Sequence, residues 1–241
     1  MHLSSLPRVR RSNLAPRPQM SFPHSDPTLN FTISPLPQMA SLPSTPFTLQ
    51  GGCFCKAISY TISIPALSSR PPLDKPPVLP FGPQSEASKR LPIIGLDHCN
   101  SCRRVSGSII QCWFICPQRW ATFSLLSRSS EERITSTPTA EVLRPTKELE
   151  ESTYIKAFDS STHAHRTFCG RCGTPLSFLY SGEDDEMVKE ENWGPHFDIA
   201  FATFERESLE VEGMTPGRQG WREDGIGWVK RVFDEGGKSL V

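Results

Sequence analysis

The sequence predicts a mainly β domain with little helix, and three observations lead to this prediction. Residues 58–64 alternate apolar with small polar side chains, which is the period-two pattern of a half-buried strand. Little of the chain between residues 117 and 153 has the period of a helix. Six of the eight cysteines form three close pairs, at Cys53 and Cys55, Cys99 and Cys102, and Cys169 and Cys172. Strand-like runs and close cysteine pairs together indicate a domain that contains strands and binds metal.

The pair Cys169 and Cys172 organises the chain, because it lies in a CxxCG turn that leads into the strand-like run 176–180. In such a turn the backbone folds so that both thiolates face one metal ion, and glycine supplies the tight geometry. A turn of this kind, a knuckle, provides half of a zinc site. The other half should be a second close pair, and both Cys53/Cys55 and Cys99/Cys102 are candidates.

Proline divides the chain of 241 residues into a leader and one domain. Of the 23 prolines, 17 lie at or before Pro92, so a long stretch of ordinary globular composition begins only after it. Residues 1–46 contain nine prolines, four arginines and a single acid, and cannot bury enough apolar surface to offset their ordering entropy. We expect a disordered or targeting leader at 1–46, with disorder favoured because proline breaks a presequence helix. A single zinc-binding domain is expected at 47–241, with a proline-rich insertion at about 65–92.

Charge and hydropathy exclude several classes of protein. The net charge is zero, so no chain-wide positive field draws the protein to nucleic acid or to an anionic membrane. No apolar run approaches the ~18 residues needed to span a bilayer. Tight CxC and CxxC pairs are typical of metal ligands in a reducing compartment rather than of a disulfide scaffold. We therefore expect a soluble cytoplasmic protein, with the mitochondrial matrix or the nucleus as alternatives.

The remaining elements are predicted in chain order. The insertion at 65–92 carries eight prolines and is either one wall of a site or disordered, with disorder favoured. On a predicted strand at 109–116, Cys112 and Cys116 share a face with apolar residues and are expected to be core side chains. Further strands are expected around Trp120 and Phe123, at 154–158 and at 197–204, and the polar region 131–151 is predicted to form loops with one short strand.

The solvent exposure of two histidines and two tryptophans is predicted from the neighbouring sequence. His163 and His165 lie in a polar Ser/Thr loop before Cys169, so we expect them to be exposed to solvent rather than to bind metal. Trp221 and Trp228 are expected to pack onto the domain, with a place beside a substrate cleft as one option, because exposing two indoles to water is costly.

Four segments together resemble one known family. They are GGCFCKAISY from Gly51, DHCNSCRRVSGS from Asp97, SSTHAHRTFCGRCGTPLSF from Ser160 and FDIAFATFE from Phe197. In this order they look like the family of glutathione-dependent formaldehyde-activating enzymes and centromere protein V, the GFA and CENP-V domains. The resemblance covers roughly residues 48–203, and GRQGWREDGIGWVKR from Gly217 resembles the tail of fungal members. The fold it implies is a β-tent of small antiparallel sheets pinned by zinc.

The resemblance also implies two zinc ions. The first and last cysteine pairs would hold a structural zinc on Cys53, Cys55, Cys169 and Cys172. The family's middle CxCxxC motif would hold an open zinc at which the thiol of glutathione adds to formaldehyde to give S-(hydroxymethyl)glutathione. A thiol bound to zinc loses its proton near neutral pH and becomes a nucleophile.

The chain departs from the family pattern in the middle motif. Cys99 and Cys102 match its second and third cysteines, whereas Asp97 stands in the place of the first. A carboxylate coordinates zinc at about 2.0–2.2 Å and carries the same charge as a thiolate, although it is a harder donor.

Two hypotheses of different classes follow. In the first, the protein is a carbon–sulfur lyase with zinc on Asp97, Cys99 and Cys102, a small thiol such as glutathione as its partner, and Arg103 or Arg104 near the anionic substrate. In the second, the middle site is empty or structural, and the domain is a non-catalytic binding module stabilised by zinc.

Overall fold

The computed structural model describes residues 41–73, 85–130, 132–182 and 193–234. The chain divides into the units Met1–Leu36 and Pro37–Val241, and every described residue belongs to the second. All structural statements below refer to these residues.

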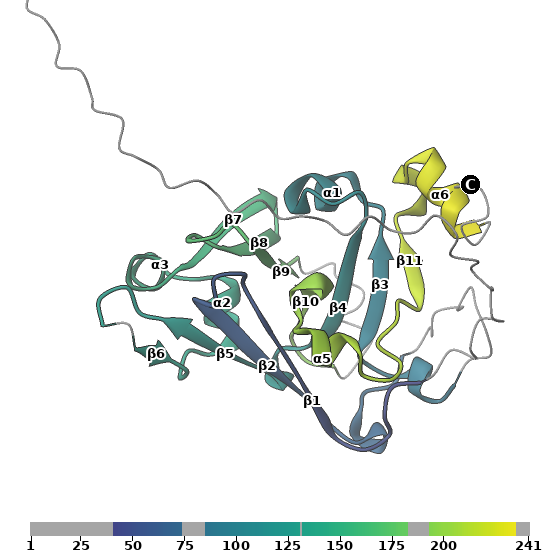
Figure 1. Ribbon diagram of the computed structural model, residues 1–241, viewed down its shortest axis with the longest axis horizontal. Coiled ribbons are helices and arrows are strands. Elements are labelled where there is room, and N and C mark those ends of the chain that lie inside the picture. The colour runs from purple at the N-terminus through teal and green to yellow at the C-terminus, as the bar shows by residue number, and fades with distance from the viewer. Residues whose placement is uncertain (1–40, 74–84, 131, 183–192, 235–241) are drawn as a thin grey trace, which may run out of the picture. The chain divides into compact units, whose positions relative to one another are not determined.

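Two sheets make up the described fold (Figure 1). The four-stranded sheet has the order β1 (Phe47–Gly52), β2 (Ile58–Ile64), β5 (Ala121–Leu126) and β6 (Arg133–Ile134). The seven-stranded sheet has the order β11 (Arg218–Gly220), β3 (Ile93–Asp97), β4 (Gln111–Pro117), β10 (His196–Ala200), β9 (Pro175–Tyr180), β8 (Ala164–Cys169) and β7 (Ile155–Ser161). Every pairing is antiparallel except that of β11 with β3. The predicted fold class, mainly β with little helix, is confirmed.

The helices in the described part of the chain are short. They are α1 (Asn100–Ser106), α2 (Thr139–Leu143), α3 (Lys147–Ser152), α5 (Arg206–Leu209) and α6 (Gly227–Asp234). None of them is long and apolar enough to cross a membrane. Short 3₁₀ turns lie at Leu67–Ser69, Ala87–Lys89, Gln118–Trp120, Phe201–Thr203 and Arg222–Asp224.

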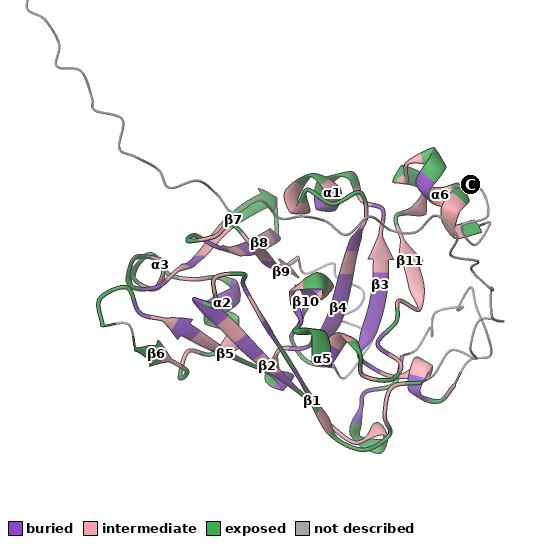
Figure 2. Ribbon diagram, in the orientation of Figure 1, coloured by how far each residue is buried: buried purple, intermediate pink, exposed green. Residues whose placement is uncertain are grey.

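Buried side chains of both sheets build the core (Figure 2): they alternate along β2, whereas they form nearly continuous runs along β3 and β4. The predicted strand at 58–64 is β2, and its apolar residues are at most 3% exposed. Tyr60 of β2 packs against Phe123 of β5, with ring centroids 5.7 Å apart. Phe123 in turn lies 6.3 Å from Phe197 of β10, so aromatic side chains join the two sheets. Burial of such rings from water contributes to the stability of the fold.

Three of the sequence-based predictions need correction. The region 131–151 contains α2 and α3 beside the short β6, and α1 follows the second cysteine pair. Helices of five to seven residues are too short to show a clear period, so the sequence signal was missing. The strand predicted at 109–116 begins at Gln111, and the strand predicted at 197–204 ends at Ala200.

The flanks of the proline-rich insertion are packed rather than disordered. Arg70 is 1% exposed and donates from Nε to the Pro65 carbonyl at 2.9 Å. Leu91 is fully buried, and an isolated bridge joins Pro72 to Arg90. Residues 74–84 lie outside the described residues, as do residues 1–40 of the expected leader and residues 183–192.

The last residues of the expected leader contact the domain. Arg70 donates from Nη2 to the Pro43 carbonyl, and the Leu67 N–H donates to the Ser44 carbonyl at 2.8 Å. Leu42 packs against the core. The packed part of the chain therefore begins ahead of β1.

We expect a chain that starts at Phe47 to be less stable than one that starts at Ser41, by about 1–3 kcal/mol, because the buried guanidinium of Arg70 loses an acceptor. Urea unfolding of the two proteins measures this difference. Equal midpoints would mean that residues 41–46 contribute nothing.

Candidate metal centres

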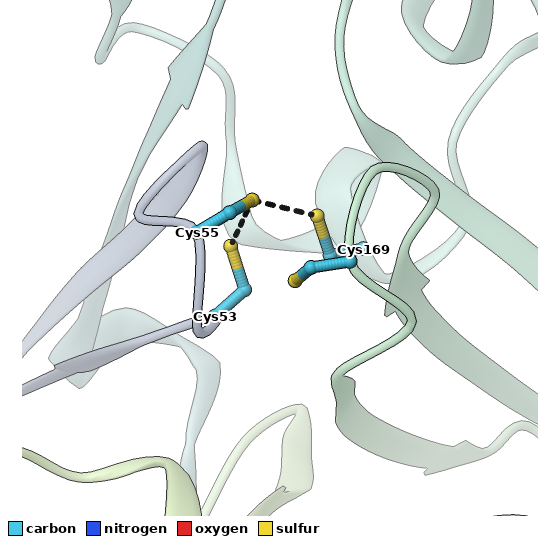
Figure 3. A group of neighbouring side chains, drawn as sticks. Cys53, Cys55 and Cys169 are labelled. Carbon is cyan, nitrogen blue, oxygen red and sulfur yellow. Dashed lines mark hydrogen bonds between the residues drawn. The ribbon is translucent and has the colours of Figure 1, made fainter. Parts of the chain in front are cut away.

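Four thiols from two hairpin turns converge at one point. Cys53 and Cys55 lie in the turn between β1 and β2, whereas Cys169 ends β8 and Cys172 lies in the turn before β9. Their sulfur atoms all lie within 4.8 Å of one another. Figure 3 shows the sulfur atoms of Cys53, Cys55 and Cys169 turned toward one another from two separate loops. The predicted pairing of the first and last cysteine pairs is thus brought together in space.

The spacing of these sulfur atoms fits one tetrahedral zinc ion. Cys55 Sγ lies 3.6 Å from Cys53 Sγ and 3.7 Å from Cys169 Sγ. Four sulfurs at ~2.3 Å from a common centre would stand about 3.8 Å apart in a regular tetrahedron. All four cysteines are free thiols, because a disulfide would need an S–S distance of about 2.05 Å.

Local backbone geometry creates both turns. Lys56 between Cys55 and β2 has φ 58°, and Gly173 after Cys172 has φ 79°. Glycine at 173 avoids the steric cost of this left-handed conformation. The Gly173 N–H donates to the Cys169 carbonyl at 2.8 Å, and the Ile58 N–H donates to Cys53 Sγ at 3.3 Å. Backbone N–H groups aimed at sulfur stabilise a thiolate.

Electrostatics favour a cation at this cluster. Burial raises the pKa of Cys53 and the pKa of Cys169 above the ordinary thiol value. Burial alone would also raise the pKa of Cys172, but hydrogen bonds from Thr174 and Cys55 outweigh it and lower that pKa to about 6. Several thiolates in one buried place would repel one another, and a bound divalent ion would compensate their charge.

A second group of possible ligands lies at the start of α1. Asp97 is the last residue of β3, Cys99 precedes α1 and Cys102 lies in its first turn. One ligand atom from each lies within 4.8 Å of the others, so the three residues could hold a metal ion. The structure thus brings together the three residues that the sequence singled out.

Asp97 is held in place by two hydrogen bonds. The Cys99 N–H donates to Oδ1 at 2.9 Å, and Trp113 Nε1 donates to Oδ2 at 3.1 Å. Each carboxylate oxygen keeps a further lone pair for a metal ion. Outer hydrogen bonds of this type orient a ligand before the metal arrives.

Arg166 supports the opposite side of this group, a role that sequence reasoning missed. Its side chain in β8 is 4% exposed, donates from Nη2 to Cys102 Sγ at 3.2 Å and donates from Nε to Ser160 Oγ at 2.9 Å. The guanidinium carbon lies 4.7 Å from the centre of the Phe178 ring. Burial raises the pKa of Cys102 to about 12, and the neighbouring Arg166 opposes that rise. Sixty-four residues separate Arg166 from Cys102, so only the fold reveals the contact.

A cavity of about 560 Å³ opens onto the second group. Its wall includes all three candidate ligands, the guanidinium-bearing Arg166 and Arg218, and Trp221. A smaller cavity of about 350 Å³ lies on another side of Cys102 and Arg166 and has a mainly apolar wall. None of the four clustered cysteines contributes to either wall.

Other residues considered from the sequence lie apart from this cavity. Arg104 is exposed, and Arg103 is half-buried with Nη2 3.4 Å from Asn100 Oδ1; neither lines the cavity. His163 is exposed as expected, but His165 is largely covered and hydrogen-bonds to Asp159 and Ser181.

The two cysteines outside both groups lie in the core or pack against it, as predicted, whereas the two C-terminal tryptophans are exposed. Cys116 is fully buried and Cys112 packs against the core, as expected. Trp221 and Trp228, by contrast, are 67% and 49% exposed, so the expectation that packing removes them from water is wrong. The buried residue of α6 is Val229 rather than Trp228, and Trp221 lines the cavity.

Comparison with known proteins adds no assignment: no family model matches this chain, and a search of the curated proteins also found no match.

We expect Cys169→Ser to leave the protein insoluble or unfolded, because Cys169 is fully buried among the four clustered thiols, and structural zinc supplies folding free energy. Cys112→Ser is the matched control, since Cys112 belongs to neither group of ligands, and it should cost far less. Soluble yield, zinc content and thermal unfolding measure both. If the two variants behaved alike, the four-cysteine assignment would be wrong.

Arg166→Leu should destabilise the fold by about 1–3 kcal/mol, because it removes the bonds to Cys102 and Ser160 together with the contact on Phe178. Arg171→Leu serves as control, since the Arg171 side chain is exposed and stacks on Tyr154. Urea unfolding at fixed zinc concentration tests this, and equal losses for the two variants would contradict it.

Proposed function

We propose that this protein is a zinc-dependent carbon–sulfur lyase that acts on a thiol adduct such as S-(hydroxymethyl)glutathione. The observation that carries the proposal is the cavity of about 560 Å³ at Asp97, Cys99 and Cys102. Three protein ligands leave one position of a tetrahedral ion open, whereas four thiols close it. The resemblance to glutathione-dependent formaldehyde-activating enzymes supports the same reading of the two groups.

The two groups would have different duties. Cys53, Cys55, Cys169 and Cys172 would hold a structural zinc that ties the two hairpin turns together. Asp97, Cys99 and Cys102 would hold a second zinc, which supplies Lewis acidity and lowers the pKa of a bound thiol.

The protein's own groups prepare this site in two ways. Trp113 and the Cys99 N–H hold the Asp97 carboxylate in one orientation. The positive charge of Arg166 lies beside Cys102, where it offsets part of the negative charge that three anionic ligands and a substrate thiolate bring together. Phe178 and Trp113 add apolar wall that limits the access of water to the reacting atoms.

The reaction balances without an oxidant or a reductant. The sulfur of the thiol donates an electron pair to the carbonyl carbon of formaldehyde, and a carbon–sulfur bond forms. The π pair of the carbonyl moves to oxygen, which takes up the proton that the thiol has given up. The reverse reaction breaks the carbon–sulfur bond and returns that proton to sulfur.

Asp97→Ala should lower the occupancy of the second zinc and abolish formation of the adduct, because one of three ligands is lost. The fold should persist, since the four-cysteine cluster is untouched. Asp97→Cys should restore a three-thiolate site and tighten the metal. Zinc analysis by mass spectrometry, together with an NMR assay of glutathione and formaldehyde, measures both effects.

The matched control is Asp159→Ala, which removes an exposed carboxylate outside both groups and should change neither zinc content nor adduct formation. A wild-type protein with one zinc ion and no adduct formation would contradict the proposed lyase activity. That result, with no effect of either change at Asp97, would instead favour a zinc-stabilised binding module.

A further inference from the structure

The C-terminal segment 214–234 is built onto the second group of ligands. Strand β11 pairs in parallel with β3, which places Gly220 opposite Asp97. The His98 N–H, between Asp97 and Cys99, donates to the Gly220 carbonyl at 3.0 Å. Residues that follow β11 must therefore lie next to the candidate ligands.

His98 fixes the segment in this position. Its ring is 4% exposed, and Nε2 hydrogen-bonds to Gln219 Oε1 at 2.9 Å. A Cβ at Gly225 would lie 2.8 Å from His98 Nδ1, so only glycine permits this approach. Phe233 of α6 meets the ring of His98 edge-on, with centroids 6.2 Å apart. The segment thus has one defined place against the domain.

Trp221 is held at the cavity in a costly conformation. It lines the cavity, is 67% exposed and has φ 52°. A left-handed backbone at a residue other than glycine costs on the order of 1–3 kcal/mol and persists only where neighbouring contacts impose it. The contacts of Gln219 and Gly225 with His98, on either side of Trp221, impose it here. An exposed indole in a strained backbone is poor for stability and well placed to cover a ligand.

Arg218 brings a positive charge to the same cavity, whose wall also includes the acidic residues Asp97 and Asp198. Its stem passes over Gly95, where an added Cβ would lie 3.1 Å from Arg218 Cγ. The side chain is half-buried and lines the cavity, and in the described part of the chain its guanidinium has no hydrogen bond or ion pair. Arg166, the other cavity arginine, is already engaged by Cys102 and Ser160. Of the two arginines among the described residues that line the cavity, Arg218 is therefore the one available to an anionic ligand.

We propose that Arg218 and Trp221 form the recognition subsite for a thiol that carries a carboxylate. Arg218 binds the carboxylate, and Trp221 covers the chain of atoms between that carboxylate and the sulfur. This inference rests on the proposed function, in which the sulfur binds at Asp97, Cys99 and Cys102. It assigns recognition of the anionic part of that thiol to two residues of the C-terminal segment.

The test is calorimetric binding to the full-length zinc protein with two probes, glutathione and glutathione esterified at both carboxylates. Arg218→Met should weaken glutathione binding about tenfold, which corresponds to about 1.4 kcal/mol, and leave binding of the ester unchanged. Trp221→Leu should weaken both probes about fivefold or more. Neither variant should change the zinc content, because neither residue is a candidate ligand.

Two matched controls keep the test specific. Arg206→Met removes an exposed arginine paired with Glu210, and Trp228→Leu removes the other exposed C-terminal tryptophan, and neither residue lines the cavity. Both should bind the two probes within about twofold of the wild-type affinity.

The outcomes separate this inference from the proposed function. A wild type with two zinc ions and adduct formation, but with Arg218→Met and Trp221→Leu binding glutathione normally, overturns the subsite and leaves the lyase standing. Equal wild-type affinity for glutathione and its ester overturns the role of Arg218. A wild type with one zinc ion that binds neither probe overturns both proposals.

Discussion

The fold depends on the junction of four thiols between the two sheets. Cys53 and Cys55 come from a hairpin of the four-stranded sheet, and Cys169 and Cys172 come from a hairpin of the seven-stranded sheet. Cys53 is 4% exposed and Cys169 is fully buried, so their thiolates have little water to stabilise them. Without a cation the thiols would stay protonated or repel one another. The contact between the two turns would then lose the stabilisation that shared metal ligands provide. The four thiols could hold a metal ion, and such an ion would stabilise this arrangement.

The same strand connects the two groups of ligands. β8 ends with Cys169 in the first group and carries Arg166, which bonds to Cys102 of the second. A register shift between Thr167 and Phe168 lies between them, and such irregularities change the direction of side chains along a strand. Because Cys169 and Arg166 lie on the same strand, a fixed position of Cys169 also restricts the position of Arg166. The first group is thus linked to the second through β8, although the candidate ligands of the second group lie on β3 and at the start of α1.

The sequence predicted features that depend on short separations along the chain. Cysteine spacing and the alternation of β2 are local, and Asp97 stands two residues before Cys99. Arg166 and Trp113 could not be found in this way, because their contacts depend on the register of β8 and β4 against other elements. The helix α1 is too short for a periodic signal. The burial expected for Trp221 was wrong because a hydropathy rule weighs the side chain alone, whereas the cavity decides its place.

The carboxylate of Asp97 fits its surroundings because it has more atoms that can accept hydrogen bonds or bind metal than a thiolate has. A thiolate has one donor atom, whereas a carboxylate has two oxygens with lone pairs to share. Oδ1 accepts the Cys99 N–H, Oδ2 accepts Trp113 Nε1, and lone pairs remain for a metal ion. The charge is the same as that of a thiolate, but the direction of the ligand is fixed by β4 and by the backbone before α1. Asp97 is thus a harder donor than a thiolate, but its orientation is better defined. Cys99 and Cys102 supply the soft sulfur donors that suit a site for thiols.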